Sequence, residues 1–277
     1  MTLERATLTV FQGRAGDRND LAIAGAAAIG ALLSQRLGLK PTTIGTPEPA
    51  LGTDWAVELG AATQALQAMA AHYATIFEQG LAPLTVLNRC AVALATLPAV
   101  ARSRPDSKVV WFDAHADLNT PRTTTTGYLG GLALAGAVGL WDSGLGNALQ
   151  LENVILAGVR DIDPPEQALI RDAGIHLIPP HNSFVDELKA AIAGSPVYIH
   201  LDCDVLNPGL VPTEYQHEGG LTLSDLHAAC EAMAENGVVG LEVAEFQNAW
   251  KPDGDPASPG PLLDALQPAI DALTRKS

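Results

Sequence analysis

Short runs of β-branched and aromatic residues alternate with longer Ala- and Leu-rich segments along the whole chain. Eight of these runs are candidate strands, at residues 6–11, 42–45, 84–87, 108–113, 153–157, 176–178, 197–202 and 238–242. Seven segments have helical composition and apolar spacing, at residues 20–37, 55–79, 91–101, 167–173, 184–193, 224–236 and 261–275. This alternation is typical of a parallel sheet with helices on its faces. We therefore expect an α/β fold with right-handed crossovers.

The composition supplies enough apolar material for a sizeable buried core. Of the 277 residues, 47% are hydrophobic and 17% are charged, which excludes a disordered chain, a collagen and a small disulfide-stabilised scaffold. Parallel α/β sheets of this length commonly form one domain. We therefore expect residues 1–277 to form a single domain.

The charge balance restricts the class of partner. Sixteen Lys and Arg against 31 Asp and Glu give a formal net charge of −15. Such a field repels nucleic acids and anionic membranes and attracts a small cation, although the same acidity can serve solubility alone. We expect no nucleic-acid partner and no membrane partner.

Cysteine usage and the apolar runs predict the compartment. Cys90, Cys203 and Cys230 are an odd number of cysteines spread far apart along the chain, which argues against a disulfide framework and for a reducing environment. The first residues do not have the pattern of a signal peptide, and the most apolar helical run, residues 23–33, is too short to span a bilayer. These features predict a cytoplasmic protein.

Residues 111–120, with the sequence WFDAHADLNT, place polar side chains directly after an apolar strand. Asp113, His115 and Asp117 are spaced two apart, so in an extended segment they share a face and can converge on one point. Two carboxylates and an imidazole favour a divalent ion such as Mn, Zn or Fe. The alternative is an acidic strand end, in which Asp113 caps a loop and His115 bonds to the backbone.

A second strand repeats this arrangement. Residues 198–207, with the sequence YIHLDCDVLN, end in Asp202 and Asp204, which are again two apart. Ligands of open parallel sheets bind beyond the carboxyl ends of the strands, and two carboxylates buried side by side are unfavourable without a cation. Together the two strand ends predict one divalent metal site.

These motifs resemble those of the ureohydrolases, the arginase and agmatinase family. The resemblance rests on DAHAD at residues 113–117 and LDCDVLNP at 201–208, with NTPRTTTT at 119–126, GVRDIDPPE at 158–166, GGLT at 219–222 and GLEVAE at 240–245 in the arginase order. It extends over most of the chain. The resemblance implies a three-layer α/β/α fold with an eight-stranded, mainly parallel sheet, a dimanganese cluster and a homo-oligomer.

The resemblance assigns the metal ligands residue by residue. Asp113 and Asp202 correspond to the bridging carboxylates, and His115 and Asp204 complete one well-held Mn²⁺ site. Asp117 corresponds to a ligand of the second site. In the implied mechanism Asp117 orients the attacking water or holds a weak second ion.

The chain departs from the family pattern at the second metal site. The family supplies a His there from a Gly-Gly-Asp-His-Ser motif, and the matching stretch is LNRCA at residues 87–91, which puts Cys90 at the position of the His. A thiolate is a soft ligand and manganese is a hard ion, so we expect the site near Cys90 and Asp117 to be weak, empty or occupied by another metal. Cys90 is equally compatible with the role of a small buried hydrophobe.

A second departure concerns the proton-shuttling His of the family. The matching position after the Thr-rich loop is Gly130, and no neighbouring residue is a good substitute. We therefore expect the chain to lack a general acid for the leaving amine and to form metal-bound hydroxide less readily than an arginase.

The residues that hold the substrate in the family are mostly retained. Asp163 and Glu166 correspond to the acidic residues around the α-amino group, and Asn119 and Thr126 correspond to residues that hold the α-carboxylate directly or through water. Glu245 corresponds to the Glu that pairs with the guanidinium in a bidentate geometry and acts in catalysis. Separately, each is also common as a turn or strand-end residue. Their joint occurrence favours a guanidino α-amino acid over agmatine.

The missing His residues favour a substrate whose hydrolysis needs less acid catalysis and less metal activation of water. A hydroxyl on the guanidine nitrogen makes that group less basic, so one metal without the shuttle His can suffice. The combination resembles the ureohydrolase subgroup of D-cycloserine biosynthesis, which carries Cys in the first metal motif and converts Nω-hydroxy-L-arginine to hydroxyurea and L-ornithine. The resemblance therefore predicts a hydrolase of antibiotic biosynthesis with this substrate.

Three other interpretations remain open. An arginase, or another guanidino- or formimino-amino-acid hydrolase, differs only in the substrate. A catalytically silent arginase-like binding protein is motivated by the two missing His residues, and its metal content would distinguish it. A metal-dependent deacetylase on a similar fold leaves Glu245 and the pair Asp163 and Glu166 without a purpose.

Overall fold

The computed structural model describes residues 6–274, in which the eight predicted strands form one sheet. The strand order is β2-β1-β3-β8-β7-β4-β5-β6, and every neighbouring pair is parallel. The strands are β1 (Ala6–Phe11), β2 (Thr42–Ile44), β3 (Ala82–Val86), β4 (Lys108–Phe112), β5 (Val154–Ala157), β6 (His176–Ile178), β7 (Val197–Asp202) and β8 (Val238–Ala244). The predicted α/β fold is confirmed, and this sheet is parallel throughout.

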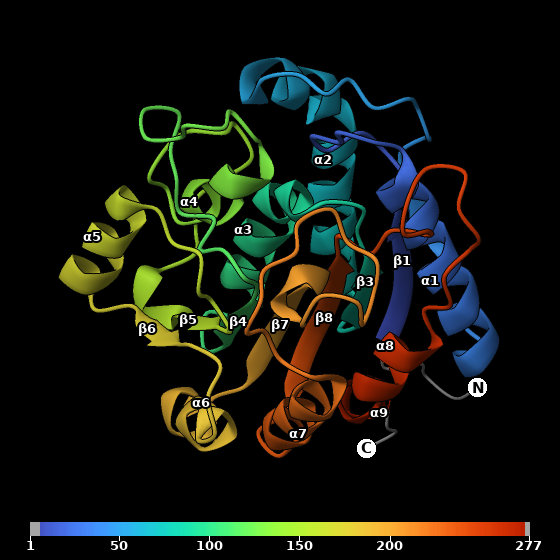
Figure 1. Cartoon of the computed structure of the whole chain (residues 1–277). Coiled ribbons are helices and arrows are strands. Elements are labelled where there is room, and N and C mark those ends of the chain that lie inside the picture. The colour runs from blue at the N-terminus through green and yellow to red at the C-terminus, as the bar shows by residue number, and fades with distance from the viewer. Residues whose placement is uncertain (1–5, 275–277) are drawn as a thin grey trace.

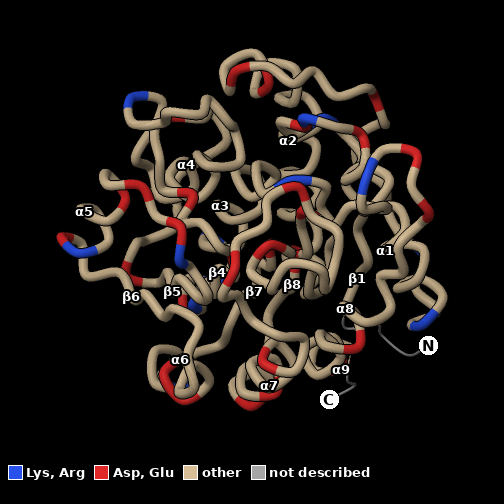
Figure 2. The backbone as a smooth tube through the Cα atoms, viewed as in Figure 1, with Lys and Arg blue, Asp and Glu red and all other residues tan. Residues whose placement is uncertain are grey.

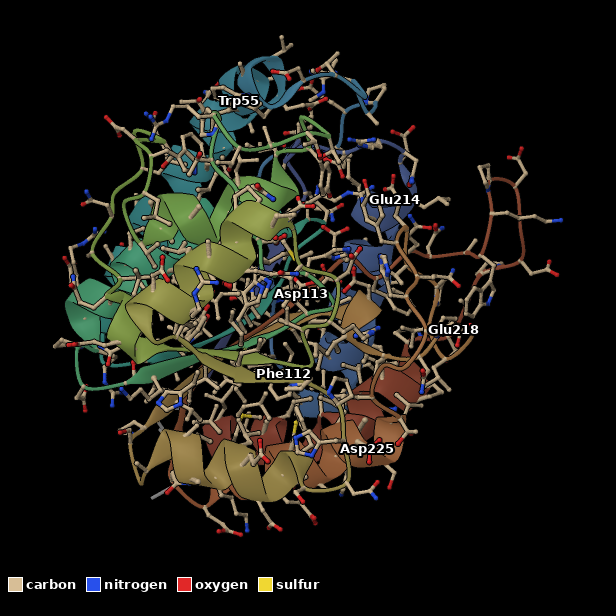
Figure 3. All side chains as sticks on the ribbon, turned by 60° about the vertical axis from the view of Figure 1, so that its left-hand side comes forward. Trp55, Phe112, Asp113, Glu214, Glu218 and Asp225 are labelled. Atoms are coloured by element: carbon tan, nitrogen blue, oxygen red, sulfur yellow. The ribbon has the colours of Figure 1, made fainter. Side chains whose placement is uncertain are left out.

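Helices cover both faces of the sheet (Figure 1). One face contacts α1 (Leu21–Leu37), α6 (Phe184–Ile192), α7 (Leu223–Ala234), α8 (Gly260–Ala265) and α9 (Gln267–Thr274). The other face contacts α2 (Trp55–Glu78), α3 (Ala93–Ser103), α4 (Ala133–Ala137) and α5 (Pro164–Ala173). Figure 3 shows the sheet between these two layers, with Phe112 in the sheet. The predicted three-layer architecture is therefore confirmed.

Several helix boundaries differ from the prediction. The helix expected at residues 91–101 begins as a 3₁₀ turn, η1 (Cys90–Val92), and continues as α3. The helix expected at residues 261–275 is divided into α8 and α9, and residue 275 lies outside the described residues. The short helix α4 follows the Thr-rich loop and was not predicted. These differences lie in the helical layers and leave the strand order unaffected.

The strand β4 shows why polar residues gather at one edge of the sheet. Val110 and Phe112 point into the core under α6, whereas Val109 and Trp111 point into the core under α3. Because helices cover both faces, a buried strand of a parallel sheet is apolar on both sides. The first acidic side chains of this segment therefore emerge at its carboxyl end, where Figure 3 places Asp113 next to Phe112.

The surface carries more acidic than basic side chains. Figure 2 shows Asp and Glu on most surface elements and also around the ends of β4, β7 and β8, with fewer Lys and Arg. Within residues 6–274 no helix combines the length and the apolar character that a bilayer crossing requires.

Gly25 allows α1 to approach the segment that follows β8. A Cβ atom at Gly25 would collide with the carbonyl oxygen of Phe246, the residue after Glu245. The variant Gly25→Ala is therefore expected to lower the free energy of unfolding by about 1–3 kcal/mol, the usual effect of overpacking. Urea denaturation followed by circular dichroism measures this change.

Gly60 in α2 provides the matched control, because nothing lies within 4 Å of the position of its added Cβ atom. The variant Gly60→Ala is expected to raise the free energy of unfolding by about 0.5–1 kcal/mol, since Ala is the better helix former. Equal effects of the two substitutions would contradict the close approach at Gly25.

Candidate active site

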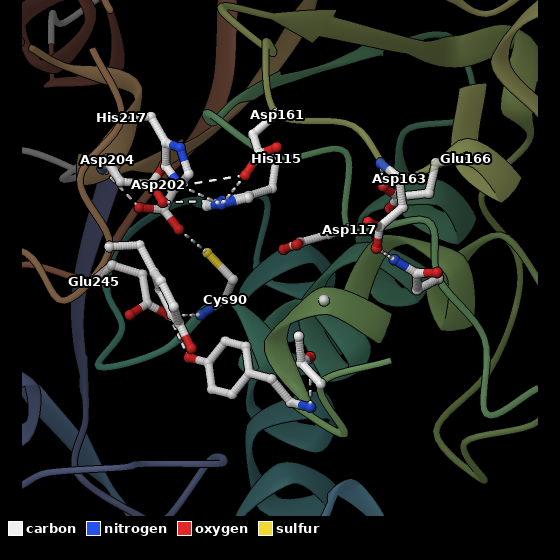
Figure 4. A pocket seen from close by; sticks show the side chains of 15 residues that line it. Cys90, His115, Asp117, Asp161, Asp163, Glu166, Asp202, Asp204, His217 and Glu245 are labelled. Atoms are coloured by element: carbon white, nitrogen blue, oxygen red, sulfur yellow. Dashed lines mark hydrogen bonds and ion pairs between the residues drawn. The ribbon is translucent and has the colours of Figure 1, made fainter. Parts of the chain in front are cut away.

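The carboxyl ends of four central strands meet beside one pocket. β3, β8, β7 and β4 are neighbours in the sheet, and candidate site residues follow each of them closely. The pocket has a volume of about 330 Å³. Of the predicted site residues, Asp113 is fully buried, and the others line the pocket (Figure 4): Cys90, His115, Asp117, Asn119, Thr126, Asp163, Glu166, Asp202, Asp204 and Glu245.

The end of β4 fixes the orientation of Asp113. Its Oδ1 atom accepts a hydrogen bond from the backbone N–H of His115 at 2.7 Å, and its Oδ2 atom accepts one from the indole N–H of Trp111 at 2.9 Å. Both oxygens of a fully buried carboxylate are therefore held by donors from the same strand end. Oδ2 keeps a further lone pair for a ligand.

The end of β7 brings Asp204 to the same place. The backbone N–H of Asp204 donates to Asp202 Oδ1 at 2.8 Å, and Asp204 Oδ1 accepts from the backbone N–H of Ala114 at 2.9 Å. The imidazole Nδ1 of His115 lies 3.0 Å from Asp204 Oδ2 and 3.2 Å from Asp113 Oδ1. The ligand atoms of these three residues lie within 4.8 Å of one another, as a metal site requires. The two strand ends thus converge as the sequence predicted.

Burial makes this group of carboxylates unfavourable without a cation. Burial and the charge of Asp204 raise the pKa of Asp113 to about 7. Burial also raises the pKa of Asp202 and of Asp117 well above the usual range, and neighbouring carboxylates add to both shifts. Repulsion of this kind is relieved by a bound divalent ion. The atoms available to ligate a metal are carboxylate oxygens and one imidazole nitrogen, and this set fits a borderline-hard divalent metal.

Cys90 lies where a second cluster of ligand atoms forms, with Asp113 and Asp117. Burial raises the pKa of the Cys90 thiol well above its usual value, and the charge of Asp202 raises it further. The protonated thiol donates to Asp202 Oδ2 at 3.0 Å and lies 3.2 Å from His200 Nε2. Cys90 therefore belongs to a hydrogen-bond network and is more than an apolar filler.

Glu245 follows β8 directly and has a left-handed backbone conformation, with φ at 65°. Asp117 shares this feature, with φ at 50°. Non-glycine residues rarely adopt this conformation, and where they do they concentrate at functional sites. The Glu245 carboxylate lines the pocket and accepts from the backbone N–H of Cys90 at 3.0 Å and from the guanidinium of Arg89 at 2.8 Å.

The opposite end of the pocket carries the predicted amino-acid contacts. Figure 4 shows Asp163 and Glu166 on the far side of Asp117 from Glu245. Glu166 accepts a hydrogen bond from the backbone N–H of Leu118 at 2.8 Å. It also accepts one from the backbone N–H of Asp163 at 2.9 Å, and this bond is part of a capping box at the start of α5. The sequence therefore predicted a group of residues that the structure brings together.

Asn119 and Thr126 also face this end of the pocket. The Asn119 amide donates to Asp163 Oδ2 at 2.8 Å, and among the described residues its buried Oδ1 atom has no hydrogen-bond partner. An unpaired buried acceptor is unfavourable unless a ligand or water donates to it. Asn119 Oδ1 can therefore accept a hydrogen bond from a ligand in the pocket. The side chain of Thr126 is exposed.

The pocket also contains residues that the sequence analysis did not assign. Tyr128 donates its hydroxyl to Glu245 Oε1 at 3.2 Å, and its ring lies 5.6 Å from that of Tyr215. His217 Nε2 lies 3.1 Å from His115 Nε2. The aromatic residues gave no sequence signal, because their neighbours in space come from a different loop. Arg89 lies behind Glu245, outside the pocket lining, and was visible in the sequence as a charged residue shortly after a buried strand.

Tyr128 occupies the space that a side chain at Gly130 would need. A Cβ atom added at Gly130 would collide with the Tyr128 ring. The ring is held by its hydrogen bond to Glu245, so a larger residue at position 130 would displace it. Glycine at position 130, which by resemblance corresponds to the shuttle His of the family, therefore leaves room for the Tyr128 ring.

Comparisons with known proteins show the family and the fold. The model of the arginase family matches residues 33–258. The N(omega)-hydroxy-L-arginine amidinohydrolase of Streptomyces lavendulae is 41% identical over 269 residues, which cover 97% of this chain and 98% of that protein. The crystal structure of Bacillus subtilis arginase superposes with a TM-score of 0.80 at 23% identity, over 98% of this chain and 99% of that one.

A further solved structure shares the fold. Entamoeba histolytica arginase in complex with L-ornithine superposes with a TM-score of 0.82 at 20% identity, and the match covers 99% of each chain.

A divalent cation is expected to stabilise the folded protein, because it removes the repulsion among the buried carboxylates. A ligand specific to the folded state adds about 2.7 kcal/mol at about 100 times its dissociation constant. Chelator-treated protein should therefore melt at a lower temperature than the same protein with added manganese. Differential scanning calorimetry measures the difference.

The variant Asp204→Asn should lose most of this stabilisation, because it removes one ligand and one of the repelling charges. Asp186→Asn is the matched control, since Asp186 is exposed in the first turn of α6. It should respond to manganese as the unmodified protein does. An equal response of both variants would argue against a cation at Asp204.

Proposed function

Because the chain belongs to the arginase family, we propose that it is an amidinohydrolase that cleaves the guanidino group of an arginine-like amino acid. The proposed substrate is Nω-hydroxy-L-arginine and the products are hydroxyurea and L-ornithine. The observation that carries this proposal is the pocket itself, where a metal-ligand cluster at one end faces acidic amino-acid contacts at the other. The 41% identity to an N(omega)-hydroxy-L-arginine amidinohydrolase supports the choice of substrate.

The metal would be Mn²⁺, held by His115, Asp113, Asp204 and Asp202. A divalent ion in such a site lowers the pKa of a water molecule and supplies a nucleophile at neutral pH. The hydrogen bonds from Trp111, the His115 backbone and the Ala114 backbone keep the carboxylates oriented for this role. A second ion near Cys90 and Asp117 would be held weakly, because a thiolate is a soft ligand for a hard ion and burial disfavours its formation.

Asp117 and Glu245 act on the reacting group. Asp117 reaches the pocket between the metal ligands and the amino-acid contacts, so its carboxylate orients the attacking water and accepts a hydrogen bond from it. Glu245 accepts a hydrogen bond from the guanidino group at the Cys90 side of the pocket. These contacts place the guanidino carbon beside the nucleophile.

The α-amino and α-carboxylate groups of the substrate lie at the far end. Asp163, Glu166 and Asn119 Oδ1 present acceptors, and this arrangement suits an α-ammonium group. Thr126 supplies a hydroxyl to the α-carboxylate, and Asn119 contacts that group through water. A pocket with acceptors for the α-ammonium favours an amino acid over agmatine.

The proposal is tested by turnover of two substrates. Manganese-loaded protein is incubated with Nω-hydroxy-L-arginine and, separately, with L-arginine, and the L-ornithine formed is quantified by amino-acid analysis. The hydroxylated substrate is expected to give a kcat/KM at least about tenfold higher, because its guanidine is less basic and needs less acid assistance. Equal or faster turnover of arginine would overturn the substrate assignment.

Substitution of Cys90 tests the weak second site. Cys90→His supplies the harder imidazole ligand, so manganese per chain is expected to rise from about one ion toward about two. Arginine turnover should rise with it. Metal content is measured by inductively coupled plasma mass spectrometry after gel filtration.

Cys230→Ala is the control for loss of a buried thiol, because Cys230 lies in the core with α7 and outside the pocket. Its manganese content should match that of the unmodified protein. Unchanged metal content in Cys90→His would show that the thiol is not what weakens the site.

We further propose that the enzyme is a cytoplasmic homo-oligomer of D-cycloserine biosynthesis, in which residues 1–277 act as one domain. The free, buried state of all three cysteines supports a reducing compartment. Light scattering of the purified protein gives the number of subunits.

A further inference from the structure

Arg89 is a fully buried cation beside the substrate-facing Glu245. Its guanidinium Nη1 lies 2.8 Å from Glu245 Oε2 and 2.6 Å from Glu214 Oε2, and its Nε lies 3.1 Å from Asp17 Oδ1. Arg89 is 0% exposed. It occupies the third position of LNRCA, where the Gly-Gly-Asp-His-Ser motif of the family has Asp. The exchange changes the charge next to Glu245 by two units.

The hydrogen bonds of Glu245 leave little room for a ligand. Oε1 accepts from the Cys90 backbone at 3.0 Å and from the Tyr128 hydroxyl at 3.2 Å, and Oε2 accepts from Arg89. An ionised carboxylate has about four acceptor positions, two on each oxygen. One position therefore remains, on Oε2. A bidentate pair with a guanidinium needs a free position on both oxygens, so the substrate can donate only one hydrogen bond to Glu245.

The charge of Arg89 also disfavours a guanidinium at Glu245. Arg89 neutralises part of the Glu245 charge, because its guanidinium is shared with Asp17 and Glu214, and Arg89 and Glu245 are buried, where solvent and salt screen them weakly. A second guanidinium at Glu245 would face the like charge of Arg89 at close range. An N-hydroxyguanidine is less basic, so it gives up its proton at a smaller cost, can bind in the neutral form without this repulsion, and can still donate one hydrogen bond.

We propose that Arg89 is a specificity-determining residue that disfavours the strongly basic guanidinium of arginine and favours a weakly basic N-hydroxyguanidine. The inference rests on the proposed amidinohydrolase function and assigns its selectivity to a fixed internal counter-ion. This is selectivity by repulsion of the competing substrate rather than by added contacts to the preferred one.

A purely structural role for Arg89 makes a different prediction. Arg89 also links the loop of Asp17 to the segment of Glu214, so its removal will lower stability in either case. If Arg89 only stabilised the fold, its substitution would reduce turnover of both substrates by the same factor. The ratio of the two kcat/KM values therefore separates the two roles.

The test compares charge removal with charge retention at position 89. Arg89→Met keeps the bulk of the side chain and removes the charge. We expect it to lower the preference for Nω-hydroxy-L-arginine over L-arginine by about tenfold, through a lower KM for arginine, because a like charge no longer faces the guanidinium. Arg89→Lys keeps the charge and should retain the preference within about twofold, even if its stability falls.

Two further variants keep the test decisive. Arg171→Met removes the same charge from the exposed end of α5, where the side chain is 71% exposed, and should leave the ratio unchanged. Glu214→Gln removes the carboxylate that competes with Glu245 for Arg89 Nη1, so the preference for the hydroxylated substrate should rise. Thermal melting and circular dichroism show whether Arg89→Met folds. If it does not fold, Glu214→Gln provides the test instead.

The outcomes distinguish this inference from the proposed function. If the unmodified protein hydrolyses neither substrate, or prefers arginine, the proposed function fails and the role of Arg89 fails with it. If the unmodified protein prefers Nω-hydroxy-L-arginine and folded Arg89→Met keeps that preference, only the inference about Arg89 is overturned. A fall of the preference in Glu214→Gln would also overturn it.

Discussion

Repulsion among carboxylates at two neighbouring strand ends is the constraint on which the rest of the site depends. β4 pairs with β7 in a register that sets Phe112 opposite Leu201, so the next residues, Asp113 and Asp202, emerge side by side. Their burial is unfavourable unless positive charge or a hydrogen-bond donor reaches each oxygen. Backbone N–H groups and the imidazole of His115 meet part of this need, and a divalent cation meets the rest.

The same logic explains the backbone around the site. Glu245 and Asp117 adopt left-handed conformations that are unfavourable for residues with a Cβ atom. Such strain persists where surrounding contacts determine the geometry. Glu245 has three donors on its carboxylate, and Gly25 lets α1 contact the backbone immediately after it. The fold therefore aims these carboxylates into the pocket and keeps them there.

Local patterns predicted the sheet and the convergence of the candidate metal ligands, because both depend on short-range sequence features. Strands appear as apolar runs, and Asp113, His115 and Asp117 stand out by their spacing after one such run. The pairing of Arg89 with Glu245 joins residues that are 156 positions apart, so it follows from strand order rather than from spacing. The filling of the space at Gly130 by Tyr128 depends equally on side-chain packing in three dimensions.

Three hydrogen-bond donors at or beside the departures from the family motif meet on Glu245. The Cys90 backbone, the Arg89 guanidinium and the Tyr128 hydroxyl all donate to this one carboxylate. The Cys90 thiol meanwhile donates to Asp202, where a His ligand in the family would direct a metal. Protons and a fixed guanidinium thus occupy positions that would otherwise serve a second ion and a cationic substrate. The donor of Cys90 is a backbone N–H that Cys90→His would leave in place, so conversion to arginase selectivity requires changes at more than one of these positions.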